Sequence, residues 1–124
     1  MRPLPVPAEG ETIETLHAFL NAAEEGDFCL MVAWVVGALR PQGPYPVLSI
    51  GGPQGAAKST TSRVLRRLVD PNASPLRTLS RDDRDLFVAS HNAYCIAFDN
   101  VSGLPAWLAD GLCRLATGGG FATR

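Results

Sequence analysis

The sequence lacks a strong excess of charge of either sign and lacks a long apolar segment. Its 124 residues carry 11 Lys and Arg against 12 Asp and Glu, a formal net charge of −1. A domain that binds nucleic acid over one broad surface is basic, so any DNA contact here must be local, or lie on other subunits or further sequence. The most apolar run, Phe28–Leu39, is shorter than the roughly 18 residues that span a bilayer. We expect no membrane association and a cytoplasmic protein.

Cysteine is scarce as well. Cys29, Cys95 and Cys113 are odd in number and have no CxxC spacing, which argues against a disulfide framework or a zinc site. Each lies in an apolar stretch, and free cysteines are often buried. We therefore expect three reduced thiols in the core. Internal repeats and low-complexity tracts are also missing, and a chain of this length forms one domain at most.

What the sequence does contain divides it into three parts. Residues 1–11 hold three prolines and a glycine, which predicts a poorly ordered lead-in. Residues 12–43 predict a helical segment. Residues 44–124 alternate apolar runs of strand length with amphipathic stretches of helix length, which predicts a mainly parallel α/β sheet.

Two helices are expected in the helical segment. The first runs from about Thr12 to Glu25, and the residues on its apolar face are Ile13, Leu16, His17 and Leu20. Gly26 is expected to end it. Asp27 can then cap a buried helix over Phe28–Leu39.

The third part has a regular order of elements. The predicted strands are Val47–Ile50, Leu76–Leu79 and Tyr94–Phe98, the last ending at Asp99. The predicted helices are Ser59–Val69, a helix from the capping box Ser80–Asp83 to about Ser90, and Pro105–Ala116, which Gly118, Gly119 and Gly120 end. In Ser59–Val69 the residues expected to face the core are Val64, Leu65, Leu68 and Val69, and those expected to face outward are Arg63, Arg66 and Arg67.

A glycine-rich loop joins the first strand to the next helix. Gly52-Pro53-Gln54-Gly55-Ala56-Ala57-Lys58-Ser59 matches G-x-x-x-x-G-K-[ST] at all but one place. In such a loop backbone N–H groups close around phosphate oxygens, and the following helix directs its positive end at the anion. Lys58 would reach the β- and γ-phosphates, and the Ser59 hydroxyl would bind Mg²⁺. The sequence predicts a site for ATP, or a similar nucleoside triphosphate, with Mg²⁺ over Gly52–Thr60.

The one departure from the motif is Ala57, where the pattern has glycine. Alanine costs nothing if this residue is already helical, and about 1 kcal/mol or more if the loop requires a positive φ. Gly55 remains for the tighter bend, so we expect a working loop. The loop resembles that of P-loop NTPases. This resemblance implies an α/β fold, here a partial P-loop domain behind an N-terminal helical segment.

Asp99 is the candidate acidic partner of the loop. It follows an apolar strand 41 residues after Lys58, and open α/β sheets place their ligands at the carboxyl ends of strands. Asp99 would hold Mg²⁺ through a water, as a Walker B residue does. A core strand ended by an Asp-Asn turn is the alternative interpretation.

Asn100 and Lys58 are the catalytic candidates. Asn100 stands where many motor ATPases have glutamate, and an amide can orient a water but cannot take its proton. Either another carboxylate is the base or hydrolysis is slow. Candidates by elimination are Asp82, Asp83 and Asp85, although a favourable charge cluster at a helix N-terminus explains them better. Neither His17 nor His91 has a partner spaced for metal binding or nucleophilic catalysis.

The segment after the Walker B-like strand resembles a helicase motif. Leu112–Arg124 (LCRLATGGGFATR) is similar to the L-T-G-G-D-x-x-x-A-R stretch of superfamily 3 helicases of phages and poxviruses, with Gly120 in place of the aspartate. In that family the stretch leads to a hairpin that follows single-stranded DNA through a ring, so Arg124 is a candidate nucleic-acid contact. A helix C-cap followed by a glycine-rich loop is the alternative. The span from about Trp34 to Arg124 also resembles ATP-binding proteins of bacterial mobile elements and prophages.

Three functions follow from these patterns. The resemblance implies a nucleic-acid-dependent motor ATPase, helicase-like, that assembles as a homo-oligomeric ring on single-stranded DNA. A P-loop small-molecule kinase and a nucleotide-binding switch without turnover are the alternatives. The helicase resemblance also implies that the chain is truncated and inactive alone, because in that class a later strand lies between the phosphate-loop strand and the Walker B strand. In kinase-type P-loop proteins those two strands are direct neighbours.

Overall fold

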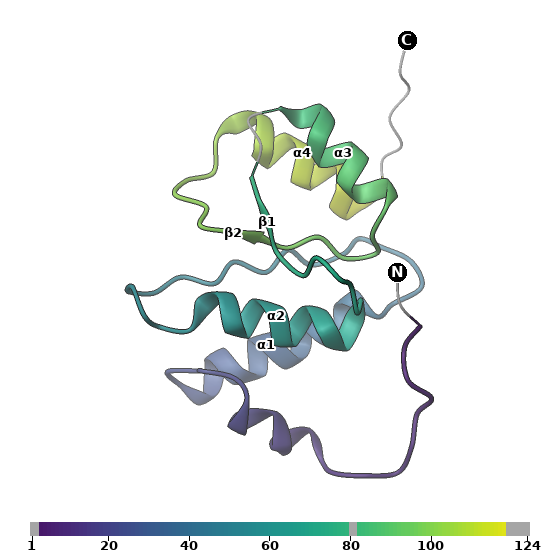
Figure 1. Cartoon of the computed structure of the whole chain (residues 1–124), viewed down its shortest axis with the longest axis vertical. Helices are drawn as coiled ribbons and strands as arrows, with labels where there is room; N and C mark the ends of the chain where they lie inside the picture. Colours follow the sequence, from purple (N-terminus) through teal and green to yellow (C-terminus); the bar gives the residue numbers. More distant parts are fainter. Residues whose placement is uncertain (1–2, 80–81, 119–124) are drawn as a thin grey trace.

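The computed structural model describes residues 3–79 and 82–118, in which helices lie on both sides of two short strands (Figure 1). The elements in chain order are a 3₁₀ helix η1 (Ile13–Ala18), α1 (Glu25–Ala38), α2 (Lys58–Val69), β1 (Arg77–Thr78), α3 (Asp83–His91), β2 (Phe98–Asp99) and α4 (Ala106–Thr117). Helix α1 packs on α2, and α3 packs on α4. Among the described residues no helix is long and apolar enough to cross a membrane.

The two strands pair in parallel. Arg77 lies opposite Phe98 and Thr78 opposite Asp99, and α3 connects the strands. Strand β1 falls inside the predicted Leu76–Leu79. Of the predicted strand Tyr94–Phe98 only its last residue is in β2, which ends at Asp99 as expected. The short ladder still fixes where Asp99 lies.

The apolar run Val47–Ile50 is not a strand, contrary to the sequence prediction. Its residues belong to an extended segment that runs between the α1–α2 pair and the strands in Figure 1, and Leu48 and Ile50 pack against the core cluster of these helices. The run is therefore only partly buried, through Leu48 and Ile50, whereas Val47 is 59% exposed. A strand also needs a neighbour for its backbone N–H and C=O groups, and the described residues supply none.

The main core lies between α1, α2 and the segment before α1. Its buried residues are Leu20, Phe28, Met31, Val35, Ala38, Leu65 and Val69. Since α2 covers only one side of α1, the opposite side of that helix is open, and Leu30 and Val36 are about two-thirds exposed. The sequence prediction of a fully buried helix over Phe28–Leu39 is therefore wrong for this face.

The helical segment before the loop also differs from its prediction. Instead of one helix over Thr12–Glu25 there is the 3₁₀ helix η1, with no buried residue. Gly26 does not end a helix but lies in the first turn of α1, which follows the N-cap Glu24 rather than Asp27. Backbone N–H groups in the first turn of a helix have no hydrogen-bond partner within the helix. A glycine there, which leaves the backbone accessible to water, therefore costs little stability.

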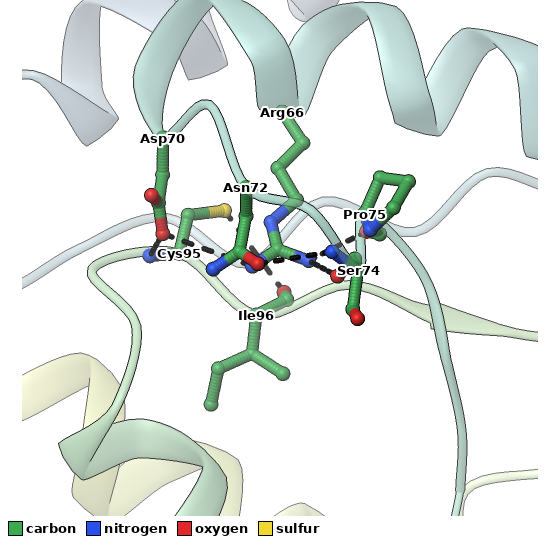
Figure 2. A network of polar contacts seen from close by, with 7 residues as sticks. All are labelled: Arg66, Asp70, Asn72, Ser74, Pro75, Cys95 and Ile96. Carbon is green, nitrogen blue, oxygen red and sulfur yellow. Dashed lines mark hydrogen bonds and ion pairs between the residues drawn. The ribbon is translucent and has the colours of Figure 1, made fainter. Parts of the chain in front are cut away.

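Arg66 is buried, although the helix pattern placed it on the outer face of α2. It is 1% exposed, and its Nη1 donates to the carbonyl oxygens of Ser74 and Pro75 at 2.8 and 2.6 Å. Its Nη2 lies 3.7 Å from Oδ2 of the fully buried Asp70, which accepts a hydrogen bond from the Cys95 N–H. Figure 2 shows this network between the end of α2 and the two segments that lead to the strands.

The cysteines are not three core thiols. Cys29 and Cys113 are exposed, and Cys95 is intermediate, so the expectation fails for two of them. Apolar sequence neighbours do not determine which side of a helix faces the core. Burial raises the pKa of the Cys95 thiol to about 11, which keeps this group protonated near neutral pH.

Candidate functional site

The glycine-rich loop is a tight turn between the extended segment and α2. Gly52 has φ of 149° and Gly55 has φ of 83°, values at which a Cβ would be strained. The N–H of Ala56 donates to the Pro53 carbonyl at 3.3 Å, which closes the turn. Helix α2 then begins at Lys58. The lysine and the serine of the motif therefore lie in the first turn of the helix, as the motif requires.

Ala57 adopts a left-handed conformation, with φ of 56° and ψ of 25°. Of the two possibilities left open by the sequence, this is the one with a cost, about 1 kcal/mol for a residue with a Cβ. Residue 57 is the position at which the motif has glycine. The loop therefore contains a left-handed residue at this position although alanine replaces the glycine of the motif.

Lys58 reaches back across the loop. Its ammonium Nζ donates to the carbonyl oxygens of Gly52 and Pro53, at 2.8 and 2.6 Å. The positive charge is thus held at the start of the loop, on the side from which the chain enters. These two contacts are exposed, so an anion can replace the carbonyl oxygens as a partner of the ammonium group.

Ser59 and Asp99 come together although 40 residues separate them. The Ser59 hydroxyl donates to Asp99 Oδ1 at 2.7 Å in a partly buried contact. The hydroxyl comes from the first turn of α2, and the carboxylate comes from the last residue of β2. A hydroxyl and a carboxylate are the hard oxygen donors that Mg²⁺ prefers. The two residues predicted as metal ligands therefore form one pair at the end of the loop.

Comparison with known families identifies the chain. A model of the family described as actinomycete integrative conjugative element replication protein matches residues 13–124. The chain belongs to this family. No curated protein and no solved structure matches it. A role in the replication of a mobile element follows from the family, in line with the resemblance to mobile-element proteins.

Asn100 of this replication protein follows directly after the Ser59–Asp99 pair. It has φ of 56°, a left-handed conformation that asparagine tolerates better than most residues, and its N–H donates to Asp99 Oδ1 at 3.0 Å. Its side chain is exposed and makes no hydrogen bond within the described ranges. The amide is therefore free to contact a ligand or a water beside Asp99.

The remaining candidate residues lie in the loop, at the start of α2 and in the tail. Gln54 is exposed within the loop and Thr60 is exposed in the first turn of α2, whereas Thr61 is buried and carries no predicted role. Arg124 lies outside the described residues, as do Gly119 and Gly120. Gly118 ends α4 in the left-handed conformation that the helix stop predicts.

One hydrogen bond to the loop was not predicted from the sequence. The side-chain amide of Asn21 donates to the carbonyl oxygen of Ala56 at 3.0 Å, across 35 residues of sequence. Asn21 lies between η1 and α1, beside the buried Leu20. No motif or periodicity marks this residue, because its role depends on how the N-terminal segment packs against α2.

His17 does have partners, contrary to the sequence reading. Its Nε2 lies 3.2 Å from a Glu14 oxygen and 3.6 Å from a Glu25 oxygen, and its ring stacks on Phe28 with centroids 3.5 Å apart. These three ionisable groups could offer ligands to a metal ion, but all are exposed and their contacts with one another explain the arrangement. The E-x-x-H spacing of Glu14 and His17 was the available signal. The contacts hold the corner between η1 and α1.

Of the three aspartates named as candidate bases, Asp82 caps α3. Asp82 is the N-cap residue, and its side chain accepts a hydrogen bond from the Arg84 N–H at 2.9 Å. Ser80 and Arg81 of the predicted capping box lie outside the described residues. The cap accounts for Asp82, and we assign no base from this group. His91 contacts the Phe87 carbonyl within α3.

Proposed function

We propose that this replication protein binds ATP with Mg²⁺ at the loop Gly52–Thr60. The observation that carries the proposal is the hydrogen bond between Ser59 and Asp99, which are the two predicted metal ligands. A chance glycine turn before a helix gives no reason for a carboxylate from a distant strand to meet that hydroxyl. The positive φ values in the loop and the position of Lys58 support the same site.

In the proposed site each residue has a distinct role. The backbone N–H groups of the loop and the first turn of α2 hold phosphate oxygens, and Lys58 exchanges its carbonyl partners for the β- and γ-phosphates. Bound Mg²⁺ supplies a positive charge that offsets the charge on the phosphates. Ser59 and Asp99 would hold it, and Asn100 would orient a water.

We further propose that the bound ATP drives a helicase-like motor on nucleic acid, assembled as a homo-oligomeric ring. The replication family and the resemblance of Leu112–Arg124 to superfamily 3 helicases support this proposal. A small-molecule kinase would differ in its sheet, because Val47–Ile50 would pair directly with the strand that ends at Asp99. In the described part of the chain β2 pairs with β1 only.

A nucleotide-binding switch without turnover is the second candidate. The observation in its favour is Asn100, whose exposed amide lies where a base is expected but cannot accept a proton from water. Ala57 adds a strained residue to the loop. Such a protein would bind ATP and change its partners without hydrolysing the nucleotide.

ATP turnover by the full-length gene product separates these functions. We expect Mg²⁺-dependent hydrolysis that rises several-fold with single-stranded DNA, and loss of most of this activity in Asp99→Asn with little change in melting temperature. ATP binding without hydrolysis would favour the switch, and phosphate transfer to a small molecule would favour the kinase. Normal hydrolysis by Asp99→Asn would contradict the assignment of Asp99.

A further inference from the structure

Asn21 contacts the proposed phosphate loop at the residue before its strained position. Its Nδ2 donates to the Ala56 carbonyl at 3.0 Å, and the next residue, Ala57, has φ of 56°. The Ala56 carbonyl and the Ala57 N–H belong to one planar trans peptide, in which they point in opposite directions. A donor on the carbonyl side therefore turns the Ala57 N–H away from Asn21.

That N–H is available to a ligand. Within the described part of the chain the Ala57 N–H makes no hydrogen bond, while the Ala57 carbonyl accepts one from Thr61 at 2.9 Å. In a phosphate-binding loop successive N–H groups must point to one side. The hydrogen bond from Asn21 fixes the orientation of the 56–57 peptide, and it offsets the strain of the left-handed Ala57.

The segment that carries Asn21 is fixed on both sides. Leu20 is 6% exposed and belongs to the core cluster of α1 and α2, and Ala22 packs against that cluster. On the other side, His17 stacks on the buried Phe28 and pairs with Glu25 at the start of α1. The side chain of Asn21 is therefore presented to the loop by packed neighbours.

We propose that Asn21 is a positioning residue of the phosphate loop, which holds the 56–57 peptide in its binding conformation and so offsets the absence of glycine at position 57. This inference rests on the proposed ATP site. It gives the N-terminal segment a part in nucleotide binding. It also explains how the loop maintains a left-handed residue that carries a Cβ.

The test is a cycle of four proteins: wild type, Asn21→Ala, Ala57→Gly and the double variant. Affinity for ATP with Mg²⁺ is measured by titration calorimetry on the full-length gene product. Asn21→Ala should weaken binding about fivefold, the effect of one hydrogen bond. Ala57→Gly alone should change little, because the loop is already held in place. The double variant should bind within about twofold of wild type, since glycine adopts the conformation without help.

Controls separate this role from folding and from the proposed function. Asn21→Asp keeps the shape but replaces the donor by an acceptor, and should lose at least as much affinity as the alanine variant. Asn92→Ala removes a similar exposed hydrogen bond, from the side-chain amide of Asn92 to the Val88 carbonyl in α3. This variant should bind ATP normally. Wild-type affinity in Asn21→Asp, or the same loss from Asn21→Ala in both backgrounds, overturns the inference. If Lys58→Ala leaves binding unchanged, the proposed ATP site itself fails.

Discussion

At the scale of residues, the proposed site rests on the hydrogen bond between the Ser59 hydroxyl and the Asp99 carboxylate. Lys58, Ser59 and Asp99 were named from motif spacing alone, and the structure brings the last two within 2.7 Å. The left-handed conformation of Ala57 could not be predicted, because alanine adopts either conformation depending on the turn around it. Asn21 was missed because its contact depends on tertiary packing alone.

The cysteines give a prediction at this scale. Near pH 8 iodoacetamide should modify the exposed Cys29 and Cys113 at least tenfold faster than Cys95, because the thiolate is the reactive form and burial raises the pKa of Cys95 to about 11. Peptide mass spectrometry over time measures the three rates. In urea the three rates should converge. Cys95 reacting as fast as the others in the folded chain would contradict the burial.

At the scale of elements, the helices that follow the loop were easier to predict than the strands. The bounds of α2 and α4 agree with the predicted ranges to within one residue at each end, since caps and periodicity are local signals. A ladder depends on a neighbouring strand, which an apolar run such as Val47–Ile50 does not specify. The burial of Arg66 likewise depends on distant carbonyl groups, although its i,i+4 spacing to Asp70 was a usable signal.

The Arg66–Asp70 pair should stabilise the junction between α2 and the strands. Asp70→Asn should lower the free energy of unfolding by about 3 kcal/mol, because it leaves the buried guanidinium without its counter-charge. In an Arg66→Met background the same change should cost clearly less. Chemical denaturation measures both effects.

The exposed Asp110 in α4 supplies the matched control for this pair. Asp110→Asn removes the same charge and should change the free energy of unfolding by less than about 0.5 kcal/mol. An equal cost of Asp70→Asn in both backgrounds would contradict this account, because the carboxylate would then act independently of Arg66.

At the scale of the whole molecule, the loop lies where three separate parts of the chain meet. The N-terminal segment contributes Asn21, α2 contributes Lys58 and Ser59, and β2 contributes Asp99. The family match places the chain among replication proteins of integrative conjugative elements. The nucleotide ligand is our proposal, and it rests on the convergence of these parts. Lys58 is the residue through which this assignment is most directly tested.

The decisive measurement is titration calorimetry of ATP with Mg²⁺ on the full-length gene product and on two variants. Lys58→Ala should weaken binding at least tenfold, about 1.4 kcal/mol, because it removes the charge that meets the β- and γ-phosphates. Arg63→Ala removes the same charge from an exposed position on α2 and should bind as wild type does. Unchanged affinity in Lys58→Ala, or no ATP binding by the wild type, would contradict the nucleotide site.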